Sequence, residues 1–594
     1  MKPFVRNLLA VITGIAIMWL LAALVVTRCV SGIVASFDAQ PPLPGNSVLV
    51  VDLSAFHLDE QTSDVPSFDP MGGMLGAPAV GLWDACDAIV SAAYDPGVKC
   101  LYIKPDGGDA GAAAIEELRA AVRLFHQSGK PVVSYLQSPS NGSLYLATAA
   151  DKVFITSDSG GMSSVIGTSL TQYFLKDLLD RLGVNVQLIR HGKYKSAGEM
   201  YVRSSSSAEN REQNQAVVDD TWKVLSAGIS ESRNLPVERL DSLVEHLSLL
   251  LPEDFVRAGL ADETAGKAGV TDYLCKMTGA DSPKTLRLVS LADYVRIHPL
   301  ADKRQGWKMA VLFVNGEMID APSNGTLSGD QYADLLEELR ADDSVKAVVL
   351  RVNSPGGSAL ASDKVRGAVD RLGQVKPVIA SYGNYAASGG YWLSSGCREI
   401  YTDAMTLTGS IGVFSLVPDF SKTARELARV GVETLGSHSH SDMLSLMRPL
   451  DKTELDAAQR QVEAIYERFV ELVADGRHLP SDFVDSVGQG RVWSGSRACE
   501  IGLTDHVGTL QDALYRASVL SGGPEEYMKW QVVQYPAPAG WKEMLSSLLN
   551  QGIERPTVLL RNTPFEGFTT AFEGLSGRTP FRVWARMPYA IEVK

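Results

Sequence analysis

The sequence predicts an α/β protein made of two similar domains in tandem, preceded by one membrane-spanning helix. Short apolar runs rich in β-branched residues alternate with amphipathic stretches of helical length, a pattern typical of parallel strands joined by helical crossovers. Similar segments recur along the chain at an offset of about 245–247 residues, the mark of an internal repeat. An unbroken apolar segment near the N-terminus is the third observation.

Four pairs of segments carry the repeat. They are 98–104 with 345–351, 129–133 with 375–379, 151–154 with 398–401, and 164–167 with 409–412. Both halves then continue into long helical segments that end in Leu-Pro and are followed by Gly-Leu. We therefore expect a first domain at 47–300, a second at 305–525 and a C-terminal tail at 526–594.

The second half shows the expected elements in order. Its strands are expected at 310–314, 347–352 and 378–381, and its helices at 329–341, at 362–372 and from residue 388. The strands are almost continuously apolar, and strands buried on both faces belong to parallel sheets. The halves should therefore each contain a mostly parallel sheet or stacked ββα units.

Residues 1–36 are expected to be a membrane anchor. The apolar run Leu8 to Val26 would span about 28 Å as a helix, close to the thickness of the bilayer hydrocarbon. Lys2 and Arg6 precede it, which predicts a cytoplasmic N-terminus with the bulk of the chain across the membrane. A cleaved signal peptide is the alternative, although its apolar region should be shorter and should end in a small-x-small site.

Composition excludes several classes of function. The net charge of −14 disfavours nucleic-acid binding, which needs an excess of Lys and Arg. The six cysteines include no CxxC pair, so neither a disulfide framework nor a zinc site is expected. We expect no cofactor and no metal.

A candidate nucleophile lies in Ala386-Ala387-Ser388-Gly389-Gly390. Ser388 follows an apolar strand and precedes a predicted helix, and the two glycines let backbone approach closely because they carry no Cβ. Amide groups at a helix start can stabilise negative charge. The alternative interpretation is a small-residue motif for helix packing.

The segment Asn353-Ser354-Pro355-Gly356-Gly357-Ser358 leaves the preceding strand. Its glycines permit a tight turn whose N–H groups can point at a ligand. Donors held in this way are what an oxyanion hole requires. A plain strand-to-helix turn is the alternative.

A serine nucleophile needs a base, and no histidine lies near Ser388 in the sequence. His438 and His440 are expected in a polar loop, without a carboxylate cluster that would support a metal. A lysine can serve if burial lowers its pKa. Lys195 is the candidate, although its segment, 190–199, would by itself be interpreted as an exposed basic loop.

Comparison of the halves favours Lys195. The first-half position that matches Ser388 is Asn141 or Gly142, and the second half has no lysine between Lys422 and Lys452. The first half thus lacks the candidate serine, and the second half lacks the candidate lysine. This complementary loss is expected of one composite site that takes its base from the first half and its nucleophile from the second.

These motifs, with Leu407-Thr408-Gly409-Ser410-Ile411-Gly412 and the closing segment 585–589, resemble the signal peptide peptidase A family in its long form. The resemblance covers nearly the whole chain. It implies tandem Clp/crotonase-like domains and a Ser/Lys dyad.

Carried over, the family's nucleophile falls on Ser388, its base on Lys195 and a serine that hydrogen-bonds the lysine on Ser410. Lys193 would lie on the surface. The oxyanion hole would use a backbone N–H of Gly356 or Gly357 together with that of Gly389.

The resemblance also implies partners. Substrates would be peptides, namely signal-peptide remnants, and the protein would be a ring-like homo-oligomer, a tetramer in the family. Residues 8–26 would hold it in the cytoplasmic membrane, with the bulk of the chain on the periplasmic side. Two alternatives stay open: a catalytically inactive membrane scaffold, and a crotonase-like acyl-CoA enzyme that shares the oxyanion turn.

Overall fold

The computed structural model describes residues 45–62, 78–108, 110–158, 160, 163–297, 306–322, 326–526, 529–537 and 583–587. The expected anchor at 1–36, including 8–26, lies outside these residues. Within the described ranges, no helix is both long and apolar enough to cross a bilayer.

The first half forms a six-stranded parallel sheet in the order β8-β6-β5-β4-β1-β9. Its strands are β1 (Ser47–Asp52), β4 (Val98–Lys104), β5 (Val132–Leu136), β6 (Lys152–Thr156), β8 (Glu263–Ala265) and β9 (Arg287–Ser290). A short separate pair, β2 (His57–Asp59) and β3 (Ala79–Gly81), lies outside it. The central strands are almost completely buried, as their continuous apolar runs predict.

The second half repeats this arrangement. Its main path runs β17-β15-β13-β11-β10-β19; off this path, β14 pairs with β13 and β18 pairs with β14. The strands are β10 (Trp307–Asn315), β11 (Ala347–Ser354), β13 (Val378–Ala387), β14 (Glu399–Thr402), β15 (Leu407–Gly409), β17 (Val492–Ser494), β18 (His506–Val507) and β19 (Trp530–Tyr535). The order β14-β13-β11-β10-β19 corresponds to β6-β5-β4-β1-β9. The sheet extends past residue 525, because β19 comes from the segment expected to be a tail.

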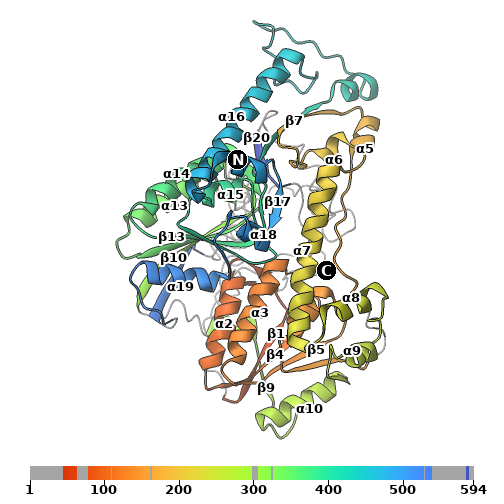
Figure 1. Ribbon diagram of the computed structural model, residues 1–594, viewed down its shortest axis with the longest axis vertical. Helices are drawn as coiled ribbons and strands as arrows, with labels where there is room; N and C mark the ends of the chain where they lie inside the picture. The colour runs from red at the N-terminus through yellow and green to blue at the C-terminus, as the bar shows by residue number, and fades with distance from the viewer. Residues whose placement is uncertain are drawn as a thin grey trace, which may run out of the picture.

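Helices cover both sheets (Figure 1). In the first half they are α2 (Leu82–Tyr94), α3 (Ala112–His126), α4 (Asn141–Ala147), α5 (Lys176–Arg181), α6 (Glu199–Val202), α7 (Ala208–Arg233), α8 (Val237–Glu245), α9 (Pro252–Ala258), α10 (Lys267–Thr278) and α11 (Leu291–Ile297). In the second they are α13 (Gly329–Ala341), α14 (Ala359–Gly373), α15 (Gly389–Ser394), α16 (Lys452–Arg477), α17 (Ser481–Val487), α18 (Gly495–Glu500) and α19 (Leu510–Leu520), with a π-helical turn at Thr423–Leu427.

One predicted strand end was wrong. The strand expected at 378–381 continues to Ala387, through polar residues that ended the apolar pattern. Polar groups of this segment find hydrogen-bond partners inside the fold. Arg351 donates to Ser381 Oγ and to the carbonyl oxygen of Tyr382, at 3.0 Å each. The strand therefore carries the chain directly up to Ser388.

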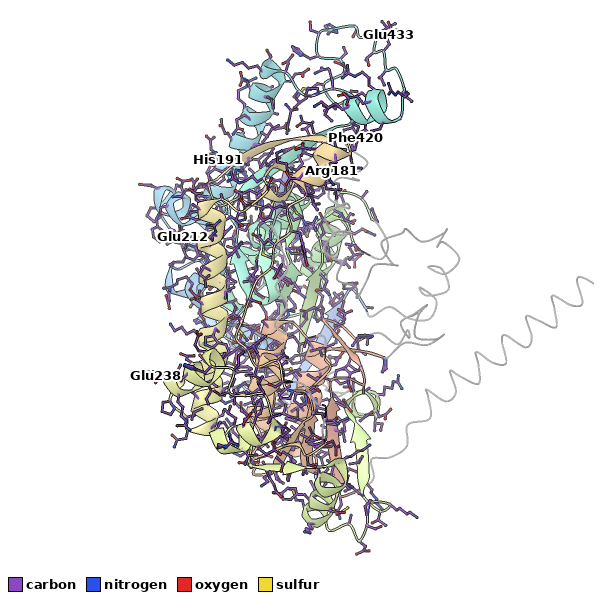
Figure 2. All side chains as sticks on the ribbon, turned by 90° about the vertical axis from the view of Figure 1, so that its right-hand side faces the viewer. Arg181, His191, Glu212, Glu238, Phe420 and Glu433 are labelled. Carbon is purple, nitrogen blue, oxygen red and sulfur yellow. The ribbon has the colours of Figure 1, made fainter. Side chains whose placement is uncertain are left out.

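A third, four-stranded sheet joins the halves in the order β12-β20-β16-β7. Its members are β12 (Gly356–Ser358), β20 (Val583–Arg586), β16 (Val413–Asp419) and β7 (Asn185–His191). Because β7 belongs to the first half and pairs along its whole length with β16, the loop that carries Lys195 is fixed to the second half. Helix α7 runs beside both halves; Figure 2 shows Glu212 high on it and Glu238, on α8, near the first-half sheet.

Arg351 on β11 anchors the contact between the halves. It is fully buried and pairs with two buried carboxylates of the first half, Glu60 at 2.9 Å and Glu117 at 2.6 Å. Burial raises the pKa of the neighbouring Glu116 to about 8. The charges at this contact lie in a region closed to water, where an unpaired carboxylate is costly.

Substitution of Arg351 by Met should destabilise the protein by about 3–5 kcal/mol, because it leaves two buried carboxylates without their cation. Arg340→Met is the matched control, since Arg340 pairs with Glu337 on the surface of α13 and such pairs contribute less than about 1 kcal/mol. The urea concentration at the midpoint of unfolding measures the change in stability of each variant. Equal shifts in the two variants would contradict the assigned role of Arg351.

Candidate active site

Lys195 and Ser388 meet in the interior of the protein. The Lys195 Nζ lies 2.7 Å from Ser388 Oγ, 3.0 Å from Ser410 Oγ and 3.1 Å from the carbonyl oxygen of Ser410. All three side chains are 0% exposed. The three side chains selected from the sequence thus form one cluster, although they come from both halves of the chain.

The contacts of Lys195 fit a neutral amine. A neutral amine has two N–H groups and one lone pair, so it can donate to the two oxygens of Ser410 and accept the hydroxyl proton of Ser388. Burial lowers the pKa of Lys195 well below its ordinary value, because water no longer stabilises the charged form of the amine. The lowered pKa favours the neutral amine, which is the form of lysine that can accept a proton.

Ser388 lies at a strained turn between β13 and α15. Its φ of 56° falls in the left-handed region, which a non-glycine residue adopts only where the surrounding structure enforces it. The enforcement is visible: its N–H donates to Gly409 O at 2.8 Å, and its carbonyl accepts from Trp392 N at 2.8 Å. The turn aims the side chain at Lys195.

The backbone at Gly356, Gly357 and Gly389 converges beside Ser388. Gly356 and Gly357 have φ of 98° and 150°, which glycine tolerates. A Cβ on Gly356 would lie only 2.6 Å from Gly389 N. The backbone of Gly356 and that of Gly389 thus lie close together, an approach that requires glycine at position 356. The N–H of Gly356 donates to Ser354 Oγ at 3.2 Å, which leaves Gly357 and Gly389 as the candidate oxyanion donors.

The segment that carries Lys195 is held from several sides. Arg190 pairs with the buried Glu199 at 3.1 Å and donates to the carbonyl of Lys195 at 2.8 Å. Gln213, from α7, donates to Tyr194 O and accepts from Val492 N. Lys193 is exposed, as predicted. The interpretation of 190–199 as a solvated loop fails because tertiary partners surround it.

Sequence reasoning missed one part of the site, the turn at 488–491. Gly490 has φ of 78°, and a Cβ on it would lie 2.5 Å from Lys195 Cβ. The turn also binds Ser410, whose N–H donates to Arg491 O at 2.7 Å. The run Gly488-Gln489-Gly490 was an available signal, because paired glycines before a strand indicate a left-handed turn.

The first-half counterpart of Ser388 differs from the expected one. Ser140 is the residue before α4, as Ser388 is before α15, so the match is Ser140 rather than Asn141 or Gly142. Ser140 and Ser143 form a capping box, in which each side chain accepts from the other's backbone N–H. The first half therefore keeps a serine there, but uses it to cap a helix.

The histidine expectation also needs correction. His440 does lie in an exposed loop, but Asp451 and Glu454 at the start of α16 are close to it, and the three could hold a metal. The sequence did not show this because the carboxylates come from the next element. Arg448 already pairs with Glu454 at 2.7 Å, which supplies the positive charge that this carboxylate needs.

Comparison with known proteins assigns the chain to a family. The family model described as peptidase family S49 matches residues 124–279 and 370–522, more than half of the sequence. The chain belongs to peptidase family S49. The first matched region contains Lys195 and the second contains Ser388, so the repeat seen in the sequence coincides with the two halves of the site.

The relatives that the chain resembles over most of its length are also named as proteases. Protease 4 of Haemophilus influenzae is 33% identical over 498 residues, 80% of each chain. The chloroplastic serine protease SPPA of Arabidopsis thaliana is 29% identical, over 72% of this chain and 63% of that protein. The protein is therefore a serine peptidase of the long SppA type.

Among solved structures, a ClpP1 mutant from Listeria monocytogenes aligns with 13% identity and a TM-score of 0.24, over 36% of this chain and 98% of that chain. The score is too low to carry an argument, so the Clp/crotonase-like fold stays a prediction. The described α/β architecture does not depend on it.

Gly490→Ala should reduce kcat/KM at least about tenfold, because the new methyl group would collide with Lys195 and move its amine from Ser388. Gly502→Ala is the matched control: its φ of 79° imposes the same backbone strain, but its nearest neighbour lies at 3.8 Å. Peptide hydrolysis and thermal unfolding are measured for both. Similar loss of activity in the two variants would show that strain, and not contact with Lys195, is responsible.

Proposed function

We propose that the protein is an endopeptidase with a Ser/Lys dyad, in which Ser388 is the nucleophile and Lys195 the general base. The observation that carries this proposal is the 2.7 Å contact between Lys195 Nζ and Ser388 Oγ at a fully buried site. A hydroxyl needs such a base to become a nucleophile. Ser410 orients the amine through its two oxygens.

The proposed reaction has two stages. Ser388 Oγ attacks the carbonyl carbon of the peptide bond while Lys195 takes its proton, and the oxyanion forms beside the amides of Gly357 and Gly389. The Lys195 ammonium then protonates the leaving nitrogen, which leaves an ester on Ser388. Water attacks this ester with Lys195 again as base, and the carboxylate product leaves.

The two alternatives predict different chemistry. An inactive scaffold has no need for a strained serine beside a buried amine, both of which cost stability. A crotonase-like acyl-CoA enzyme would share the oxyanion donors, but it would need a site for a nucleotide. Phosphonylation of Ser388 by a fluorophosphonate, in which Oγ displaces fluoride from phosphorus, separates the peptidase from both when it is detected by mass spectrometry.

The setting of the enzyme is also a proposal. The apolar segment 8–26 supports a single membrane anchor with the catalytic halves on the periplasmic side. An anchored peptidase would meet signal-peptide remnants in the membrane, the substrates that the family resemblance implies. A homo-oligomer, tetrameric by the same resemblance, would enclose the sites. Fractionation and light scattering of the full chain test the anchor and the oligomer.

Ser388→Ala and Lys195→Ala should each lower kcat/KM by at least about 10³-fold, because each removes one partner of the proton transfer. Ser140→Ala and Lys193→Ala are matched controls. Ser140 occupies the equivalent position before α4, and Lys193 belongs to the same loop as Lys195 but is exposed. Full activity in Ser388→Ala would contradict the proposal.

The pH dependence follows from the lowered pKa of Lys195. Activity should rise with pH through that pKa, well below 10.5, because only the neutral amine accepts a proton. Since the unfolded lysine binds protons up to its ordinary pKa, the unfolded state holds more protons in this window, and stability should also rise with pH.

Lys195→Met should therefore be more stable than the wild type near pH 7, with a difference that shrinks toward pH 10.5. Thermal unfolding between pH 6 and 10 measures it. A difference that grows with pH would mean that Lys195 is charged in the folded protein.

A further inference from the structure

Helix α3 of the first half contacts the two strands of the second half that end at the site. Figure 1 shows α3 where the two halves meet. Strand β13 ends directly before Ser388, and strand β15 ends directly before Ser410. The bonds between α3 and the second half therefore lie within a few residues of two of the side chains that contact Lys195.

The N-terminus of α3 is capped by a residue of the other half. Gly111, the residue before the helix, has no side chain that could accept a hydrogen bond. Asn384 Oδ1, from β13, instead accepts from the N–H groups of Ala113 at 3.1 Å and Ala114 at 3.4 Å. A Cβ on Gly111 would collide with this side-chain amide, so the glycine admits the cap. Asn384 thus satisfies two of the N–H groups that a helix start leaves unpaired.

One turn further along α3, Glu116 holds the loop that leads into β15. Its Oε2 accepts from the N–H of Met405 at 2.6 Å, and the N–H of Ala404 also hydrogen-bonds to this carboxyl group. The Met405 side chain is 3% exposed and belongs to the apolar core of the first half. The loop at 403–406 is therefore attached to the first half by its backbone and by a side chain.

The other polar groups of this loop have partners in the second half. Ala404 O accepts from Ser496 N at 3.1 Å. Thr406 O accepts from Gly495 N at 2.7 Å. The two N–H groups, in contrast, depend on a carboxyl group of the first half. Removal of that acceptor would leave them unpaired, which is costly away from water, so the loop would have to move.

A displaced loop would disturb the site because β15 is short. It has three residues, which pair with β13 on one side and β17 on the other, so its position depends on how its two ends are held. At its far end, Gly409 O accepts the N–H of Ser388 at 2.8 Å. Ser410 follows and supplies both oxygens to which the amine of Lys195 donates.

The carboxyl group of Glu116 is neutral in its surroundings. Burial raises its pKa to about 8, so the protonated form predominates at pH 7. The titratable groups that face it are Glu117 on the same helix, Asp403 at the start of the loop and Tyr145 on α4. Glutamine, which is neutral and keeps an acceptor oxygen, is therefore its closest substitute.

We propose that Glu116 is a positioning residue for the peptidase reaction: from α3 it holds the loop before β15, and through β15 it sets the place of Ser410 beside Lys195. Asn384 contributes by seating the helix. The inference deepens the proposed function and rests on it, because Ser410 affects the reaction only if Lys195 is the base. The first half then supplies the base and also fixes the group that orients it.

The first experiment separates kcat from KM. Glu116→Ala should lower kcat about tenfold and change KM less than about twofold, because the orientation of the amine is lost while the peptide site is kept. Glu116→Gln should restore kcat to within about twofold of the wild type, since it keeps the acceptor. Arg123→Ala is the matched control, because Arg123 lies on the same helix and pairs with Glu231 on the surface. It should keep the wild-type kcat and KM.

Hydrolysis of a fluorogenic peptide measures these constants, at a temperature where circular dichroism shows every variant to be folded. Equal kcat in Glu116→Ala and Glu116→Gln would overturn the proposal.

The second experiment uses the pH profile to separate positioning from loss of stability. A partly unfolded variant has fewer active molecules, but these keep the wild-type profile. If Ser410 has moved, water beside Lys195 stabilises the charged amine, so the acid limb of kcat/KM should shift to higher pH in Glu116→Ala. The limb should stay in place in Glu116→Gln and Arg123→Ala. An unshifted limb in Glu116→Ala would overturn the proposal.

The third experiment tests the part played by α3. Asn384→Ala removes the cap and should also lower kcat. Because both side chains act through the same helix and loop, the double variant with Glu116→Ala should lose little more than the weaker single variant. Losses that multiply would show that Asn384 acts separately and would overturn the role assigned to the helix.

The fourth experiment does not depend on catalysis. In a Ser388→Ala background, amide hydrogen exchange of the segment 404–411, followed by mass spectrometry, should be faster with Glu116→Ala than with Glu116→Gln. Equal exchange in the two would overturn the inference even if the dyad is correct. Failure of the proposed function would appear instead as full activity in Ser388→Ala, which leaves the exchange result intact.

Discussion

The site depends on a lysine amine that is kept out of water. Lys195 is completely buried and its neighbours are hydroxyl and carbonyl oxygens, so the neutral form is favoured. The same burial is costly, because a lysine in water would be charged. The surrounding structure provides the compensation: Arg190 and Gln213 fix the backbone of the loop, and Gly490 lets the lysine stem pass.

Duplication explains how such a site can be assembled. Each half supplies a parallel sheet, and the third sheet ties β7 of the first half to β16 of the second. The base therefore reaches the nucleophile through a strand pairing and not through the loop alone. Ser140 illustrates the divergence of the halves: it lies before α4 as Ser388 lies before α15, but its side chain caps the helix.

The sequence by itself determined the α/β class, the repeat and the identity of Ser388, Lys195 and Ser410, because periodicity, self-similarity and motifs are local properties of a chain. Only the tertiary structure decided that Lys195 is buried, that Gly490 lies against it, and that the C-terminal segment 583–586 pairs with β12 and β16. The physical reason is that burial and contact between distant segments depend on how strands pair in space. A basic loop and a C-terminal tail look solvent-exposed until the partners that enclose them are known.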